Sequence, residues 1–464
     1  MNTNYFTAVK VLTAADRISG HEADKRDGRN DFAIDRDRIL YSKAFRRLSD
    51  KTQVFFSDEI KDLRTRLTHT LEVNQIAKTI VSLLGCNLDL TEAIALGHDV
   101  GHTPFGHVGE RTLNLIMNNC EQLGIPVNDN NQGFKHNLQS LRVLCDLENE
   151  LNLSKYTLWG IANHSKLLYS DCKIKQNICY TLHHPSVCVK HKPNKCKLSC
   201  KFYDDYLAKI GGDSYWSVEG LVVELADEIA QRHHDIEDSI RFKILSRTAL
   251  LDKLSVFEPV FSALDHENYD KLKTLTDASD DVFLSQFSRL IVKAYVVNLT
   301  NETKSRIIQK GVEMEINNAQ DFRDKKHLIS IEEAKRLVSF TDAFADADKE
   351  FHAFLKSTIL NSYGAQSMDG KGAYIIRRLF EAYMSNPTQL PDEEIVNFYA
   401  SIRITGKSIG QMRGEINKYR NTDVRRNHLM RVITDYIASM TDAYAYNQYD
   451  LLYGTIANLN VSNK

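Results

Sequence analysis

The stretch Gly97-His-Asp-Val-Gly-His-Thr-Pro-Phe-Gly-His-Val-Gly-Glu110 gathers histidine, carboxylate and glycine residues into one short segment. Imidazole and carboxylate groups are ligands for divalent metal ions. Adjacent residues of a helix point about 100° apart, so His98 and Asp99 can share one ion only if it lies beyond the end or edge of their helix. A glycine on either side of this pair gives the backbone that freedom. The stretch therefore predicts a metal-binding turn between two helices.

Apolar residues on both sides of this turn recur at steps of three and four, which is the period of an amphipathic helix. The clearest helix runs from Thr65 to Leu84 and is closed by Gly85. Pro104 lies near the start of another, where proline is tolerated. The helices predicted up to residue 240 cover residues 65–84, 92–98, 105–118, 134–170 and 218–240.

The rest of the chain follows the same pattern. Only 7 prolines and 21 glycines interrupt 464 residues, and such low breaker content favours helices. We expect loops near Gly364–Gly372 and over residues 386–392, and no linker. The prediction is an all-α protein with a core over residues 1–300 and a C-terminal helical region, residues 301–464, packed on that core.

Overall charge and hydropathy exclude several classes of protein. With 59 basic and 61 acidic residues the net charge is −2, so any contact with nucleic acid must come from a local patch. The N-terminal residues have no apolar signal-peptide segment, and we expect no membrane-spanning run. We therefore expect a cytoplasmic protein without a membrane partner.

Further metal ligands are predicted on two other helices. His69 lies four residues before Val73 and so on the inward face of the helix over residues 65–84. Asp227 belongs to a polar stripe, at steps of three and four, that also contains Gln231 and Asp235. Two histidines and two carboxylates, His69, His98, Asp99 and Asp227, would hold a metal ion and leave positions for water, as metal-assisted hydrolysis requires.

The chain resembles the HD-domain deoxynucleoside triphosphate triphosphohydrolases, often called deoxyguanosine triphosphate triphosphohydrolase-like proteins. The resemblance covers the chain from near its N-terminus almost to its C-terminus. The segments that carry it are 45–55, 64–69, 97–110, 134–142, 226–227, 234–235 and 435–444.

The resemblance implies an activity and a set of roles. Family members use Mn²⁺ or Mg²⁺ to hydrolyse deoxynucleoside triphosphates to deoxynucleoside and inorganic triphosphate. The metal ligands would be His69, His98, Asp99 and Asp227. The catalytic pair would be His107 and Glu110, which are three residues apart and share a helix face. Substrate would be bound by Arg66 and His102 at the phosphates, and by Gln53 and Asp235 at the sugar 3′-hydroxyl.

The chain departs from the family pattern at Gln231, where a tyrosine usually packs against the 2′ position of the sugar. An amide excludes a 2′-hydroxyl less by bulk, so preference for deoxyribose is less firmly predicted than hydrolysis. No motif names the base, and dGTP or several deoxynucleotides remain open. The family also implies a homo-oligomer.

An irregular insert over residues 171–215 contains most of the cysteines. Cys188, His191, Cys196 and Cys200 have the spacing of a compact zinc site, in which Cys172 or Cys179 could substitute. Free thiols explain the same pattern equally well. Lysines in the insert indicate either a solvated loop or contact with phosphate, single-stranded DNA or a nucleotide effector.

Two other functions stay open at this point. One is an HD-type nucleotidase or phosphodiesterase, although such an enzyme would not need Arg66, His107 and Glu110 as a triphosphate apparatus. The other is a non-catalytic protein that binds nucleotide or single-stranded DNA.

Overall fold

The computed structural model describes residues 2–8, 12–23, 28–52, 64–118, 133–148, 151–165, 200–258, 270, 274, 278–421 and 423–454. In these residues the regular structure is helical, and the only β-type pairings are the isolated bridges Arg17–Ser154 and Thr52–Thr65. The prediction of an all-α fold is confirmed.

The helices up to residue 254 are α1 (Asp31–Leu40), α2 (Lys43–Arg47), α3 (Arg66–Leu84), α4 (Leu88–Gly97), α5 (Gly106–Met117), α6 (His136–Arg142), α7 (Lys155–Asn163), α8 (Asp204–Ile210), α9 (Val218–Arg241) and α10 (Arg247–Leu254). The later helices are α12 (Asp280–Glu313), α13 (Ala319–Lys325), α14 (Ile331–Leu337), α15 (Asp342–Leu360), α16 (Tyr363–Ser385), α17 (Asp392–Ser401), α18 (Ile409–Glu415), α19 (Asp423–Ser439) and α20 (Asp442–Tyr453). Short 3-10 turns join several of them, and a π-helical turn over Val143–Leu147 extends α6.

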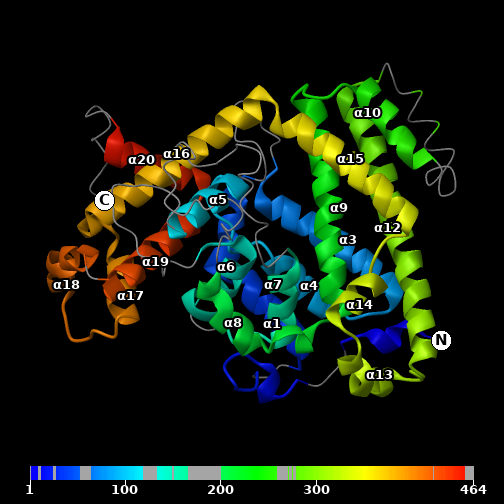
Figure 1. Ribbon diagram of the computed structural model, residues 1–464, viewed down its shortest axis with the longest axis horizontal. Coiled ribbons are helices and arrows are strands. Elements are labelled where there is room, and N and C mark those ends of the chain that lie inside the picture. Colours follow the sequence, from blue (N-terminus) through cyan, green and yellow to red (C-terminus); the bar gives the residue numbers. More distant parts are fainter. Residues whose placement is uncertain are drawn as a thin grey trace, which may run out of the picture.

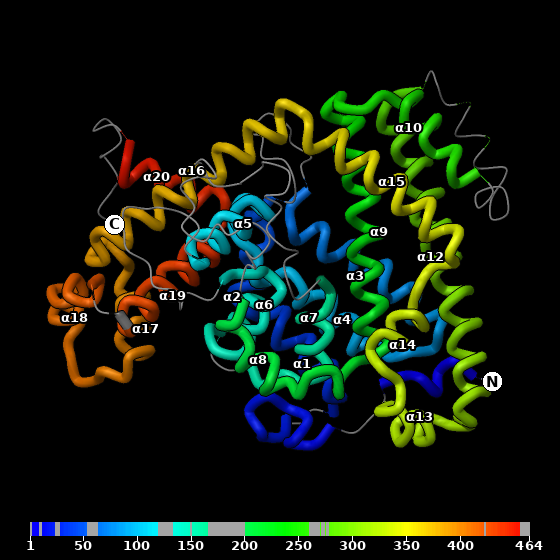
Figure 2. The backbone as a smooth tube through the Cα atoms, viewed as in Figure 1, coloured from blue at the N-terminus to red at the C-terminus, as the bar shows by residue number. Residues whose placement is uncertain are grey.

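The helices form two bodies. The first is built on α3, α4 and α9, with α1 and α7 packed on α4 and with α12 and α15 beside α9 (Figure 1). The second gathers α16 to α20 at the opposite end of the molecule, as the gold, orange and red part of the tube shows (Figure 2). Each body has its own apolar core, and α5 contributes Leu113, Ile116 and Met117 to the second. Because α5 follows the His98-Asp99 turn, that turn lies where the two bodies meet.

Capping residues explain where the two main site helices begin and end. The Thr65 side chain accepts from the backbone N–H of Thr68 at the start of α3, and Gly85 ends this helix at φ 72°, a left-handed conformation that favours glycine. Ser217 caps α9 by accepting from the N–H of Gly220. The predicted bounds of both helices therefore agree closely with the structure.

The predicted loop near Gly364–Gly372 is wrong, because this segment lies inside α16. The Cβ of an alanine at 372 would lie 2.9 Å from the Cβ of Phe105, so this glycine lets α16 approach the loop before α5. Packing against α5 and the second core outweighs the weak helix propensity of glycine. The segment predicted helical over 134–170 is described as two helices, α6 and α7. The proposed boundary at residue 300 falls inside α12, whereas the two apolar cores divide between α15 and α16.

Among the described helices, one, α12, is long and apolar enough by length and composition to cross a membrane. Half of its most apolar part is buried within the protein. The helix packs against α3 and α9, as the core helix of a globular body does.

Most of the cysteine- and lysine-rich insert lies outside the described residues, including Cys172, Cys179, Cys188, His191 and Cys196. Cys200 is described and is buried in the first core. The residues that follow it form α8 rather than an irregular loop. The proposal of a zinc site in the insert stays a proposal.

Candidate metal centre and active site

The four predicted metal ligands come together at one point of the first body. His69 Nε2 lies 2.8 Å from Asp227 Oδ1. His98 Nε2 lies 3.7 Å from Asp99 Oδ1 and 3.9 Å from Asp227 Oδ1. The ligand atoms of His69, His98 and Asp99 all lie within 4.8 Å of one another. Helix α3, the turn after α4, and α9 thus supply four nitrogen and oxygen donors to a shared space.

The protonation of His98 fits a metal ligand. Its Nδ1 lies 2.7 Å from the carbonyl oxygen of Ala95, which can only accept, so Nδ1 carries the proton and Nε2 a lone pair. Nε2 is buried and has no hydrogen-bond partner among the described residues. Leaving a buried imidazole nitrogen without a partner costs free energy, and a divalent cation would remove that cost. The side chain of Asp227 is 25% exposed, so the space is accessible from one side.

A serine on α6 fixes the turn that carries His98 and Asp99. Ser140 Oγ accepts from the N–H of Gly101 at 2.9 Å, and it also lies 2.9 Å from the carbonyl oxygen of His98. A Cβ at position 101 would lie 2.2 Å from the backbone nitrogen of Ser140. Glycine is required here because α6 packs directly on the turn.

Arg66 reaches the same space from the first turn of α3. Its Nη1 lies 2.5 Å from Asp99 Oδ2, and the side chain is fully buried. Burial alone would raise the pKa of Asp99, but attraction to nearby positive charge, that of Arg66 included, outweighs it and holds this pKa well below its usual value. The Nε and Nη2 groups of Arg66 have no described partner, so they remain as donors for an anion beside the metal ligands.

The predicted catalytic pair is in contact. His107 Nδ1 lies 3.2 Å from Glu110 Oε2, and the His107 side chain is 62% exposed while Glu110 is buried. Burial would raise the pKa of Glu110, but His136 and His107 outweigh it and lower this pKa well below its usual value. Glu110 is therefore an anion that orients an accessible imidazole.

Two further histidines extend this pair towards the metal ligands, and sequence reasoning assigned no role to either. His136 Nδ1 lies 2.8 Å from Glu110 Oε2, and its Nε2 lies 3.2 Å from His164 Nε2. His164 Nε2 in turn lies 3.9 Å from Asp99 Oδ1. His136 lies inside the matching segment 134–142, so that motif was an available signal. For His164 the sequence holds no comparable signal, because its contact with Asp99 depends on how α7 packs on α4.

His102 lies between the proposed metal ligands and the pair of His107 and Glu110. Its ring stacks on that of His136 with centroids 4.2 Å apart, and its Nε2 lies 3.9 Å from Asp99 Oδ1. Burial, together with the charge of Arg66, lowers the pKa of His102 well below its usual value. A neutral, buried ring at this place can contact a ligand only through its edge, which fits the predicted phosphate contact.

The predicted sugar-binding residues are only partly described. Gln53 lies outside the described residues. Asp235 lies two turns beyond Asp227 on α9 and is buried, and burial raises its pKa to about 7. Gln231 lies between them on the same helix and is half-buried. The predicted stripe of Asp227, Gln231 and Asp235 is therefore continuous along α9.

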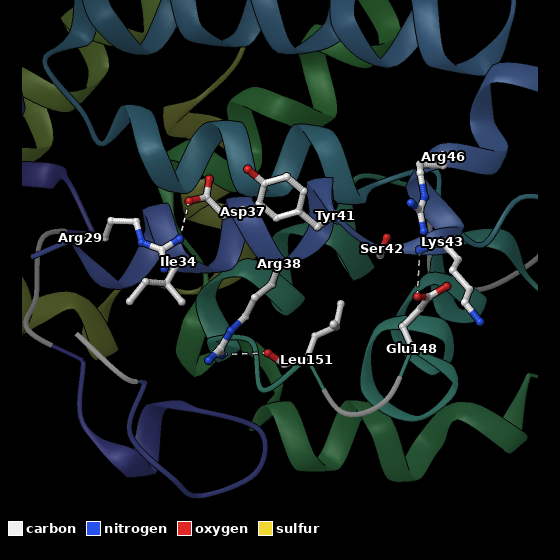
Figure 3. Close-up of a pocket in the computed structure, with 10 residues that line it drawn as sticks. All are labelled: Arg29, Ile34, Asp37, Arg38, Tyr41, Ser42, Lys43, Arg46, Glu148 and Leu151. Carbon is white, nitrogen blue, oxygen red and sulfur yellow. Dashed lines mark hydrogen bonds and ion pairs between the residues drawn. The ribbon is translucent and has the colours of Figure 1, made fainter. Parts of the chain in front are cut away.

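A basic pocket of about 810 Å³ lies elsewhere, on α1 and α2 (Figure 3). Arg29 pairs with Asp37, Arg38 donates to the carbonyl oxygen of Leu151, and the N–H of Lys43 donates to Glu148. None of the predicted site residues lines this pocket. The histidine cluster and this pocket are separate features of the molecule.

An all-helical body with a histidine–aspartate turn and further histidine and carboxylate groups around it defines an HD-type phosphohydrolase. The HD domain family matches residues 66–180, and a phosphohydrolase-associated domain matches residues 338–401 and 407–451. The chain belongs to the deoxyguanosinetriphosphate triphosphohydrolase-like family.

Relatives that match over nearly their whole length support this family assignment. Deoxyguanosinetriphosphate triphosphohydrolase-like proteins of Caulobacter sp. (strain K31) and Geobacter metallireducens are each 31% identical to this chain, over 93% and 92% of it and 92% and 90% of their own length. The protein of the same name from Rickettsia felis is 30% identical over 94% of both chains. The predicted family is confirmed.

Proposed function

We propose that the protein hydrolyses deoxynucleoside triphosphates to deoxynucleoside and inorganic triphosphate, with a divalent metal ion held by His69, His98, Asp99 and Asp227. The observation that carries the proposal is the convergence of these four donors around the unpaired His98 Nε2. The names of the relatives support the substrate class.

Mixed nitrogen and oxygen donors suit Mn²⁺ as well as Mg²⁺, although Mg²⁺ prefers oxygen. When bound, such an ion polarises a phosphoryl oxygen and lowers the pKa of a water molecule. The chain supplies the remaining functions. Arg66 presents two N–H groups to the phosphate next to the metal ligands, and His102 lies beside it.

The exposed His107 would exchange a proton with the reacting phosphate ester. Glu110 orients its ring through Nδ1, which leaves Nε2 to face the substrate. Asp235 would accept a hydrogen bond from the sugar 3′-hydroxyl. These roles together fit a reaction in which the 5′ oxygen leaves with a proton.

The test is incubation of the purified chain with Mn²⁺ or Mg²⁺ and each of the four deoxynucleoside triphosphates, followed by separation of products. We expect deoxynucleoside and triphosphate, with activity lost on chelation and reduced at least 10³-fold in Asp227→Ala, as an order-of-magnitude estimate for removal of a catalytic metal ligand.

Release of orthophosphate or pyrophosphate would contradict this reaction. Faster turnover of nucleoside monophosphates or oligonucleotides would favour a nucleotidase or phosphodiesterase. Binding of nucleotide that is unchanged in Asp227→Ala, without turnover in either protein, would indicate a non-catalytic role.

A further inference from the structure

Behind His69, two more side chains lead from the candidate metal centre to the protein surface. His69 Nδ1 lies 3.2 Å from Nδ1 of His234, and His234 Nε2 is hydrogen-bonded to Glu72 Oε2. His69 and Glu72 belong to α3, and His234 belongs to α9, which packs against it. The two histidine side chains are 1% exposed and that of Glu72 is 36% exposed.

The contacts in this row determine where the protons lie. A neutral imidazole has one N–H and one lone pair, and an ionised carboxylate only accepts. His234 must therefore donate from Nε2 to Glu72, which leaves a lone pair on its Nδ1. His69 must then donate from Nδ1 to that lone pair. A neutral His69 therefore carries its lone pair on Nε2, on the side that faces Asp227.

This arrangement places two acceptors against each other. His69 Nε2 and Asp227 Oδ1 are 2.8 Å apart, so a lone pair and a carboxylate oxygen repel unless a cation lies beside both. A divalent ion bound by both atoms, with His98 Nε2 as a further ligand, satisfies every group in the row with neutral histidines. The proton positions are thus those of a metal-binding His69.

We propose that Glu72 and His234 are positioning residues that hold His69 in the tautomer and orientation in which its Nε2 binds the divalent ion. The inference rests on the metal centre of the proposed function. A group that accepts the remaining N–H of a metal-bound histidine fixes its ring and increases its basicity. Here His234 is that group, and Glu72 fixes the ring of His234 in turn. Hydrogen bonds from His233 and His234 outweigh burial and hold the pKa of Glu72 well below its usual value, consistent with an ionised acceptor.

Glu237, one turn beyond His233 on α9, offers a matched control. Glu72 also contacts Arg64 and His233, at 3.4 and 3.5 Å. Glu237 contacts the same two residues, with His233 at 3.5 Å. The described contacts of Glu237 do not include His234. A variant at 237 therefore reports the effect of losing a carboxylate near Arg64 and His233 without disturbing His69.

The experiment is calorimetric titration of the metal-free full-length protein with Mn²⁺ alone. Glu72→Ala should weaken Mn²⁺ binding about 10- to 100-fold, the usual effect of losing the hydrogen bonds that orient a metal-bound histidine. Glu72→Gln should weaken it less, because the amide oxygen still accepts from His234. Glu237→Gln should bind Mn²⁺ as the wild type does. At saturating Mn²⁺ the turnover number of Glu72→Gln should return close to the wild-type value, because Glu72 does not touch substrate.

Two results would overturn the proposal. The first is equal Mn²⁺ affinity in wild type and Glu72→Ala, with thermal unfolding showing that both are folded. The second is binding of two Mn²⁺ per chain, of which Glu72→Ala loses one, since Glu72, His233 and His234 would then themselves be a metal site. Because no nucleotide is present, weakened Mn²⁺ binding upholds the inference even if deoxynucleotide hydrolysis is not found.

Discussion

At the scale of single residues, the candidate centre depends on which atom of each histidine carries the proton. His98 and His164 each donate from Nδ1 to a backbone carbonyl, that of Ala95 and that of Ile161, at 2.7 Å. Burial lowers the pKa of His164 to about 3, so its ring is neutral. Helix backbone thus turns two imidazole lone pairs towards Asp99 without the help of other side chains.

Asp235 gives a prediction about pH. Burial raises its pKa to about 7, and only the ionised carboxylate is a strong acceptor for the sugar 3′-hydroxyl. The ratio of kcat/KM for dGTP to that for the 3′-deoxy analogue ddGTP should therefore fall as the pH decreases below about 7. Because dGTP and ddGTP carry the same triphosphate, the effect of its ionisation on kcat/KM cancels in this ratio. In Asp235→Asn the ratio should be low and independent of pH.

The same pKa has a consequence for stability. The pKa of an unfolded aspartate is about 3.9, so folding is penalised once the carboxyl ionises, and stability falls as the pH rises from about 4 to about 7. Asp235→Asn should remove that fall, which urea unfolding at several pH values would measure. The opposite outcome would be a dGTP-to-ddGTP ratio of kcat/KM that does not change over this pH range, together with a constant difference in unfolding free energy between the wild type and Asp235→Asn. It would show that Asp235 has the pKa of an ordinary aspartate.

At the scale of helices, sequence period and capping predicted much of the first body. Thr65 and Gly85 mark both ends of α3, and the polar stripe of α9 is present as expected. Two features were not accessible to that reasoning. The glycines of residues 364–372 indicate a loop locally. The close approach of α16 to Phe105 explains Gly372, whereas a Cβ at Gly364 or Gly370 would meet nothing within 4 Å. His164 joins the site through tertiary packing, which no local pattern encodes.

Replacing glycine by alanine should therefore have opposite effects on stability at Gly101 and at Gly370. In Gly101→Ala the new methyl group would meet the backbone of Ser140 at 2.2 Å and of His136 at 2.5 Å, so α6 must move away from the His98-Asp99 turn. Overpacking of this kind costs about 1–3 kcal/mol. We expect a matching loss in the free energy of unfolding, measured by urea titration, together with weaker Mn²⁺ binding.

Gly370→Ala is the control. This exposed position lies inside α16, and a Cβ there would meet nothing within 4 Å. Replacing glycine by alanine in a helix should stabilise the protein by up to about 1 kcal/mol. Loss of stability at 370 as large as that at 101 would show that the effect comes from the substitution type and not from contact with α6.

At the scale of the whole molecule, the site is held between two apolar cores. The second body reaches the first through buried polar groups. Asp435 of α19 accepts from Arg142 and Gln139, and the buried Lys51 donates to the carbonyl oxygens of His102 and Ala438. Burial lowers the pKa of Lys51 to about 7. The C-terminal helices thus fix backbone on both sides of the residues proposed to contact substrate.

Asp442, the first residue of α20, connects the second body to two separate segments of the chain. Its Oδ1 accepts from the N–H of Phe105 at 2.9 Å, and its Oδ2 accepts from the N–H of Thr52 at 2.9 Å and from the Thr52 hydroxyl. Phe105 has a φ of 60° and immediately precedes α5, which carries His107. Thr52 immediately precedes Gln53. One carboxylate therefore holds two segments that lead into proposed substrate-binding positions.

Asp442→Asn should uncouple the two bodies without removing volume. Because both carboxylate oxygens face donors, the amide group must point its own N–H groups at either Phe105 or Thr52. A buried donor left without an acceptor costs about 1–3 kcal/mol. We expect kcat/KM for deoxynucleotides to fall roughly 5- to 150-fold, the equivalent of that energy, while Mn²⁺ affinity stays unchanged because no metal ligand touches Asp442. Asp392→Asn, which breaks the exposed pair with Arg413 inside the second body, should leave kcat/KM unchanged. Equal activity in the two variants would mean that the first body holds its substrate-binding loops without the C-terminal helices.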